Sequence, residues 1–236
     1  MPDEPPPAVP PSTPPPQHVV PGATLPPLQR AVVPPPEPLR ADEVNAALSN
    51  PLRAIDVVLA SPRRVAQNLE TSTSLVTLAV VFLATAALFA LPYGFVLGTD
   101  AWWRVTAFYL GSTLLCLPSL FVFSAYLGFG AKLTSTTVLA LTIPASAALF
   151  TAGFAPILWF LQITFDSEAK QIGWRDVSNV LLWISLGAGV VQLWRSMRKP
   201  PVDTAGAFLF VLMWMAWHAV FFYVLARMGH VLGLVR

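Results

Sequence analysis

The stretch LTSTTVLALTIPASAALFTAGFAPILWFLQITF, residues 133–165, contains no Asp, Glu, Lys or Arg. Four other charge-free stretches occur, at residues 71–99, 105–131, 177–194 and 204–226. A helix rises about 1.5 Å per residue, so about 20 apolar residues cross a hydrocarbon layer of about 30 Å. The sequence therefore predicts an all-α polytopic membrane protein built as a bundle of five transmembrane helices.

The overall composition agrees with this prediction. Hydrophobic residues make up 55% of the chain and charged residues only 11%, which would leave a soluble globule covered in apolar patches. We therefore expect the lipid bilayer to be the main partner. The net charge is only +2 and no dense Lys/Arg cluster occurs, so we expect no nucleic-acid partner. Cys116 is the only cysteine, which excludes an intrachain disulfide.

The charge-free stretches set approximate limits for the spans. We expect spanning helices at residues 74–97, 105–128, 137–162, 177–195 and 205–228, within a transmembrane domain at 71–236. The stretch at 133–165 would form a straight helix of about 50 Å, about 20 Å longer than the hydrocarbon layer is thick. We therefore expect this helix to bend or overhang. Prolines are predicted to kink the helices at Pro92, Pro118, Pro144 and Pro156.

Residues 1–40 differ sharply from the rest and contain most of the 24 prolines. Proline fixes φ and removes a backbone donor, which opposes helix and sheet and favours extended polyproline II. We predict a disordered, proline-rich cytoplasmic tail. Pro7 to Pro10 satisfies the PxxP pattern of ligands for aromatic grooves, so a cytoplasmic partner is one interpretation and a semi-rigid spacer is the other.

Residues 41–70 are predicted to form amphipathic juxtamembrane helices. Asn50-Pro51 and Ser61-Pro62 both read as an N-cap followed by proline at the first helical position. One face of the first helix is apolar, with Leu52, Ile55, Val58 and Leu59, and Val65 and Leu69 share a face in the second. We expect these faces to lie at the headgroup level, with a soluble partner as the alternative.

The connectors predict the orientation of the chain. Basic residues precede the first span and lie between spans two and three and between spans four and five, as Arg53, Arg63, Arg64, Lys132, Arg195, Arg198 and Lys199. Because basic connectors stay in the cytoplasm, we expect a cytoplasmic N-terminus and, after five crossings, a C-terminus on the opposite side. The richness in Arg, Ala, Leu, Val and Pro suits a GC-rich bacterial genome, so we expect the bacterial inner membrane.

Several side chains are expected at the membrane interface. Indoles near predicted helix ends can sit half in lipid and half among headgroups. The expected interface residues are Trp102, Trp103, Trp174 and Trp194, together with Arg53, Arg63 and Arg64, whose guanidinium groups would reach anionic lipid.

The sequence offers little chemistry. No carboxylate lies inside a charge-free stretch, although intramembrane acids usually mark proton or ion transport. No GxxxxGK[ST], GxSxG, HExxH or CxxC motif occurs, so we expect a non-enzymatic protein without metal or cofactor. His218 lies in the middle of the fifth span and is the one candidate cofactor ligand. His230 is about 18 Å further along the helix, too far to share a metal with His218; a packed, hydrogen-bonded histidine is the ordinary interpretation.

Small residues indicate where helices can approach closely. Gly94 and Gly98 satisfy GxxxG, and Gly187 and Gly189 leave the fourth span with little bulk. We predict helix packing at these four glycines, either within the monomer or at a homodimer face.

The order of parts resembles the Yip-domain family of integral membrane proteins: a polar N-terminal region, short surface helices and five spans. Residues 57–65, VVLASPRRV, look like the opening of prokaryotic members, and Leu91-Pro92-Tyr93-Gly94 is a faint counterpart of the DLYGP-type motif of eukaryotic members. The resemblance would cover about residues 50–230. It implies a small non-enzymatic membrane protein with a partner-binding or membrane-organising role.

Three functions remain open from the sequence. The first is a Yip-like scaffold, membrane-organising or partner-binding protein, alone or as a homodimer. The second is an accessory subunit of a larger membrane complex, in which His218 touches a cofactor held by other subunits. The third is a small-solute channel or transporter that uses the proline-containing second and third spans as a gate.

Overall fold

A computed structural model describes residues 37–60, 62–71, 73–98, 102–126, 132–164, 173–197 and 204–234, except the side chains of Ala60, Arg175, Thr204 and Ala205. All of these residues belong to one compact unit, Pro36–Arg236. Of the tail predicted at residues 1–40, residues 1–36 lie outside the described part of the chain, whereas Leu39 is buried and hydrogen-bonded to Asn68, so the prediction of disorder is wrong there.

Every regular element in the described ranges is a helix. The elements are α1 (Ala41–Ser49), α2 (Pro51–Ile55), the π-helix η1 (Asp56–Ala60), α3 (Pro62–Thr71), α4 (Leu75–Leu97), α5 (Trp102–Tyr126), α6 (Leu133–Thr164), α7 (Gly173–Ser196) and α8 (Thr204–Val231). The last five are long and apolar enough to cross a membrane. The all-α bundle of five candidate spans is therefore confirmed, with boundaries within a few residues of those expected.

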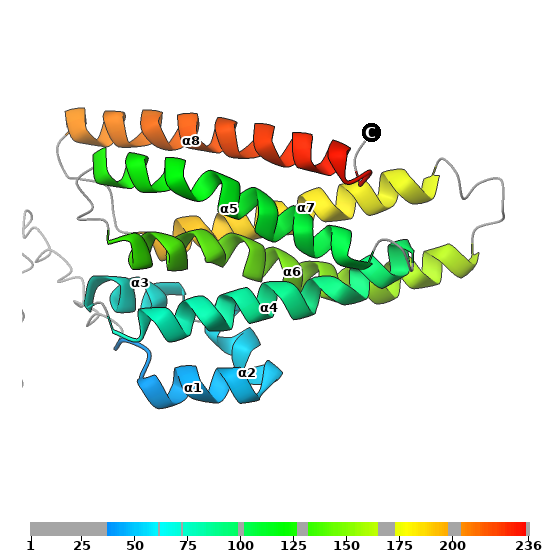
Figure 1. Cartoon of the computed structure of the whole chain (residues 1–236), viewed down its shortest axis with the longest axis horizontal. Coiled ribbons are helices and arrows are strands. Elements are labelled where there is room, and N and C mark those ends of the chain that lie inside the picture. The colour runs from blue at the N-terminus through cyan, green and yellow to red at the C-terminus, as the bar shows by residue number, and fades with distance from the viewer. Residues whose placement is uncertain are drawn as a thin grey trace, which may run out of the picture. The chain divides into compact units, whose positions relative to one another are not determined.

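The five spans alternate in direction (Figure 1). Helices α4, α6 and α8 begin at the end of the bundle where α3 lies, and α5 and α7 begin at the other end. We call the segment from Glu37 to Thr71 the cap, and the two ends of the bundle the cap end and the far end. The first span, α4, starts at the cap end. Because the described part of the chain has five spans, an odd number, the last span, α8, finishes at the far end.

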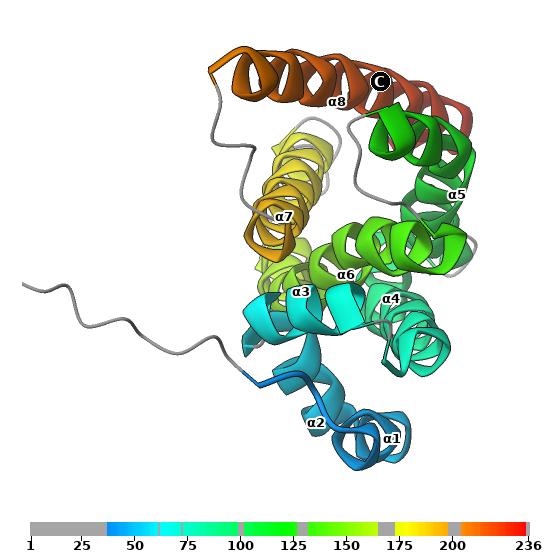
Figure 2. The ribbon, with the colours of Figure 1, turned by 90° about the vertical axis from the view of Figure 1, so that its left-hand side faces the viewer.

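Helix α6 is the centre of the bundle. It packs against α4, α5 and α7, whereas α8 packs mainly against α5 (Figure 2). In the most apolar 18 residues of α6, 72% are buried, against 28–39% in the other four spans. The residues from Ala140 to Leu149 are all buried, and half of them are Ala or Ser. Small side chains let neighbouring helices approach α6 from several sides. Because these helices cover most of its surface, this long helix needs no charged face.

Four prolines lie inside these helices without ending them. Pro92 lies in α4, Pro118 in α5, and Pro144 and Pro156 in α6, which is continuous over its 32 residues. Each proline removes the donor for the carbonyl four residues earlier. The 32 residues of α6 rise about 48 Å, which exceeds the thickness of the hydrocarbon layer and fits the predicted overhang. The predicted kinks at the four prolines stay predictions.

The four glycines predicted at packing positions divide into two pairs. A Cβ built on Gly189 would lie 2.5 Å from the Ile143 carbonyl oxygen of α6, and one on Gly94 would collide with the backbone of Trp102. A Cβ on Gly187 or Gly98 would meet no atom of the described residues within 4 Å. Gly98 instead ends α4 with φ +150°, a backbone conformation that favours glycine. Close approach within the chain is therefore seen at Gly94 and Gly189, and the expectation of packing at Gly98 and Gly187 is not met within the chain.

We expect Gly189→Leu to separate α7 from α6 and to destabilise the bundle by about 1–3 kcal/mol, because overpacking forces the backbone to shift. The matched control is Gly187→Leu, two residues away on the same helix, where a side chain meets open space. Thermal unfolding of both variants in the same detergent measures the difference. Equal midpoints for the two variants would contradict the close contact at Ile143.

Candidate functional site

The cap buries its apolar side chains against the bundle. Leu39, Val44 and Val65 form one core cluster with residues of α4 and α6 that include Phe82 and Val138. Part of the apolar surface of residues 41–70 thus contacts the chain's own spans, and the position of these helices at the headgroup level stays a prediction. Hydrophobic periodicity shows that a face will be buried but not against what, and here the nearest apolar surface is the flank of the chain's own spans.

The predicted apolar face of residues 52–59 is only partly buried. Val58 is 3% exposed, whereas Leu52 is 69% exposed at the junction of α1 and α2. The change from α-helix to π-helix at Asp56 shifts the residues that face the bundle, so the periodicity of a regular helix does not hold across it.

A buried asparagine fixes the entry of the chain into the cap. The Oδ1 atom of Asn68 accepts from the Leu39 amide at 2.6 Å, and its Nδ2 donates to the Leu39 carbonyl at 3.0 Å and the Thr73 carbonyl at 3.2 Å. Asn68 is fully buried, so these bonds satisfy its amide where water cannot. Sequence reasoning missed Asn68; the available signal was a polar residue three positions after Val65, on the apolar face of α3.

Arg64 makes contacts within the cap instead of pointing at lipid. Its guanidinium forms an ion pair with Glu43 at 2.5 Å and donates to the Glu37 carbonyl at 3.1 Å. The Arg40 amide also donates to Glu43 at 3.0 Å. The bond from the Arg40 amide, followed by the Arg64 guanidinium, holds the pKa of Glu43 below its ordinary value. Arg53 and Arg63 are exposed, as interface residues would be.

A glutamine from α7 ties the cap to the bundle. The Nε2 atom of Gln192 donates to the Val58 carbonyl at 2.8 Å and to the Leu59 carbonyl at 3.1 Å. Pro62 has no amide hydrogen, so the Val58 carbonyl lacks the helical donor four residues later. Gln192 replaces that donor across 134 residues of sequence. Gln192 is 5% exposed, so both ends of the interaction are protected from water.

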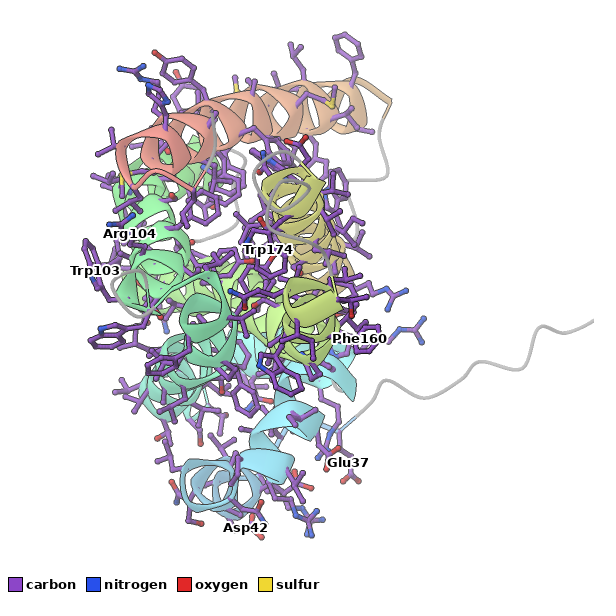
Figure 3. All side chains as sticks on the ribbon, turned by 90° about the vertical axis from the view of Figure 1, so that its right-hand side faces the viewer. Glu37, Asp42, Trp103, Arg104, Phe160 and Trp174 are labelled. Carbon is purple, nitrogen blue, oxygen red and sulfur yellow. The ribbon has the colours of Figure 1, made fainter. Side chains whose placement is uncertain are left out.

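A charged cleft opens between the helices of the cap. It has a volume of about 290 Å³ and is lined by Leu39, Asp42, Glu43, Ala46, Arg53, Asp56, Val57 and Arg64. Glu43 and Arg64 are paired in its wall. Within the described part of the chain, Asp42, Asp56 and Arg53 form no ion pair. Figure 3 shows Asp42 on α1, at the opposite side of the molecule from the α8 helix.

The predicted interface tryptophans lie at both ends of the bundle. Trp102 and Trp103 are exposed at the start of α5, and Trp174 is half-buried in the first turn of α7, all at the far end (Figure 3). Trp194 lies near the cap end of α7 and is 44% exposed. Trp102 and Trp103 also line an apolar groove of about 390 Å³ between α4 and α5.

His218 lies in an aromatic cluster between α7 and α8. Its ring centroid is 5.8 Å from Trp194, 5.4 Å from Trp214 and 5.1 Å from Trp217. Its Nδ1 contacts the Trp214 carbonyl at 2.7 Å, and its Nε2 is buried without a hydrogen-bond partner among the described residues. Among the described residues, no three His, Cys, Asp or Glu side chains are arranged to hold a metal. The cavity beside Trp214 and Trp217 is too narrow for a water molecule.

Polar side chains inside the spans connect helices. The Tyr93 hydroxyl of α4 donates to the Ser178 carbonyl of α7 at 2.5 Å. The Tyr109 hydroxyl of α5 is completely buried and lies near the hydroxyls of Thr151 and Ser185, on α6 and α7. These groups give four spans a shared polar centre in an otherwise apolar core.

Comparisons with protein-family models, with curated proteins and with solved structures give no match for this chain. The cap and its cleft are therefore interpreted from their own geometry.

We expect Gln192→Leu to destabilise the protein by about 1–3 kcal/mol, because the buried Val58 carbonyl loses its donor. In a Pro62→Ala background, residue 62 regains an amide hydrogen, and the same change at Gln192 should cost less. A double-mutant cycle measured by thermal unfolding gives the coupling. Additive effects of the two changes would contradict the replacement of the missing donor by Gln192.

Acid should weaken the contacts that hold residues 37–40 against α1 and α3 within the cap. Because the pKa of Glu43 is lowered on folding, its contribution to stability is present above its ordinary value of 4.5 and is lost as the pH falls through the lowered value. We expect the wild-type midpoint to exceed that of Glu43→Gln at pH 7, and the difference to shrink toward pH 3. A difference that stays constant with pH would contradict the role of the Glu43 charge.

Proposed function

We propose that this chain is a non-enzymatic integral membrane protein of Yip-like architecture that acts as a scaffold, organising the membrane or binding partners at its cap. In this proposal the cap and the proline-rich tail are cytoplasmic, the C-terminus lies on the opposite side, and the membrane is a bacterial inner membrane. The basic connectors support this orientation.

The observation that carries the proposal is the rigid attachment of a charged cap to the spans. Gln192 joins α7 to η1, and apolar side chains of the cap share one core cluster with α4 and α6. Within the cap, Asn68 joins α3 to Leu39. A mobile surface helix would need neither bond. Rigid presentation lowers the entropy lost when a partner binds, which favours a docking role.

The distribution of polar groups also supports a role without transport. In the described spans, ionised side chains lie only near helix ends, as Arg104, Asp176, Arg195 and Arg227 do. The Tyr93 hydroxyl of α4 bonds to a carbonyl of α7, whereas the Thr151 and Ser185 hydroxyls bond to carbonyls of their own helices. The hydrogen-bonding capacity of these three side chains is thus used inside the bundle.

The accessory-subunit function stays open because of one feature, the outer face of α8. This helix packs mainly on α5 and exposes large apolar side chains along its length: Phe208, Leu212, Met215 and Tyr223. Lipid or a second membrane subunit would cover this face equally well.

Site-specific photocrosslinking in native membranes tests the proposal. A photoreactive residue at exposed Asn45 of α1 should yield a discrete crosslinked protein, and one at Asp176 at the far end should not. The expected result is an adduct specific to Asn45 that is lost in Gln192→Leu, where the cap is loosened. Labelling that is absent at Asn45, or equal at both positions, would contradict a partner-binding cap.

A further inference from the structure

The cleft of the cap carries charges that the fold does not use. Glu43 and Arg64 neutralise each other in its wall. Asp42 on α1 and Asp56 on η1 contribute two further carboxylates, and Arg53 on α2 contributes one guanidinium. None of these three side chains forms an ion pair in the described part of the chain. The cleft therefore presents separate negative and positive groups to whatever enters it.

The size and chemistry of the cleft restrict its occupant. Its volume of about 290 Å³ is far larger than a single ion or water, whose share of liquid volume is about 30 Å³. The carboxylates are not arranged with a third ligand to hold a metal, within the described residues. Leu39, Ala46 and Val57 add apolar surface to the lining. A small organic zwitterion with a short carbon linker matches these features.

The location of the cleft indicates where such a zwitterion comes from. Helices α1 and α2 pack against α4 and lie beside its first half (Figure 1). Val76 and Val80 on this part of α4 are exposed. In a chain that spans a bilayer, such apolar surface faces lipid. The charged cleft thus adjoins a lipid-facing surface.

We propose that the cleft binds the phosphoethanolamine headgroup of a bilayer lipid. The ammonium group donates hydrogen bonds to Asp42 and Asp56, and the phosphate accepts from Arg53. A choline headgroup carries no N–H and cannot make the first set of bonds, so the cleft discriminates between the two zwitterionic lipids. The inference rests on the proposed function and deepens it, because it names the lipid class that the cap recognises.

Native mass spectrometry of the full chain, released from nanodiscs containing equal phosphatidylethanolamine, phosphatidylcholine and phosphatidylglycerol, tests the proposal. The variants are Asp42→Asn combined with Asp56→Asn, and Arg53→Gln. These side chains are exposed, so the fold should tolerate the changes. The matched controls are Asp176→Asn and Arg227→Gln, which remove exposed charges of the same kind outside the cap.

We expect the wild type and both controls to retain phosphatidylethanolamine preferentially. The double variant should retain about tenfold less, because two charge-assisted hydrogen bonds are lost, and Arg53→Gln should also retain less. Equal retention of phosphatidylcholine by the wild type, or undiminished retention by the double variant, would overturn the proposal.

A second arm distinguishes the lipid from the free headgroup. Soluble phosphoethanolamine, added to the nanodiscs, should displace the lipid only at high concentration, because it lacks the acyl chains that hold the lipid beside α4. Saturation of the cleft by the soluble compound at low concentration, with no lipid retained, would overturn the lipid as ligand. Loss of lipid selectivity with intact crosslinking from Asn45 would sink this inference alone, whereas loss of crosslinking with intact selectivity would sink only the partner-binding role.

Discussion

The packing of small side chains along α6 is the interaction on which the rest of this structure depends. Because Ala140, Ala147 and Ala148 add almost no bulk, α4, α5 and α7 can all contact one helix. In lipid, apolar helices gain little from avoiding the solvent, so close van der Waals contact and hydrogen bonds must hold them together. Gly189 against Ile143 and Tyr93 against Ser178 supply both kinds of interaction. The α8 helix, which packs on α5 and not on this centre, remains the most exposed span.

The same need for satisfied polar groups explains how the cap is attached. A π-helix followed by Pro62 leaves the Val58 carbonyl without its helical donor, and α7 provides Gln192 at that position. Asn68 does the same for the extended backbone at Leu39. The Gln192 bond links the cap to α7, and the Asn68 bonds hold α3 to Leu39 within the cap. The cap is thereby a fixed platform of charge beside the first span, which is the basis for the proposed docking and lipid-binding roles.

The spans could be predicted from the sequence because the signal is local: a charge inside lipid is costly, so its absence over about 20 residues is informative by itself. The arrangement of the site could not. The apolar faces at Val58 and Val65 were expected against headgroups, and only the fold shows that α4 and α6 cover them. Gln192 and Val58 are 134 residues apart, so their hydrogen bond could not be predicted from the sequence. Pro62, which has no amide hydrogen, did indicate that the Val58 carbonyl lacks its helical donor. His218 was the one candidate cofactor ligand in the sequence, and the structure shows that its ring packs against Trp214 and Trp217.

Cysteine accessibility in sealed vesicles tests the central claim, a five-helix bundle with its cap on one side of the membrane, most directly. In a Cys116→Ala background, which removes the one native cysteine, single cysteines are placed at Asn45 in the cap and at Leu234 beyond α8. A membrane-impermeant maleimide should label Asn45→Cys only from the cytoplasmic side and Leu234→Cys only from the opposite side. Labelling of both positions from the same side would require an even number of crossings and would contradict the account.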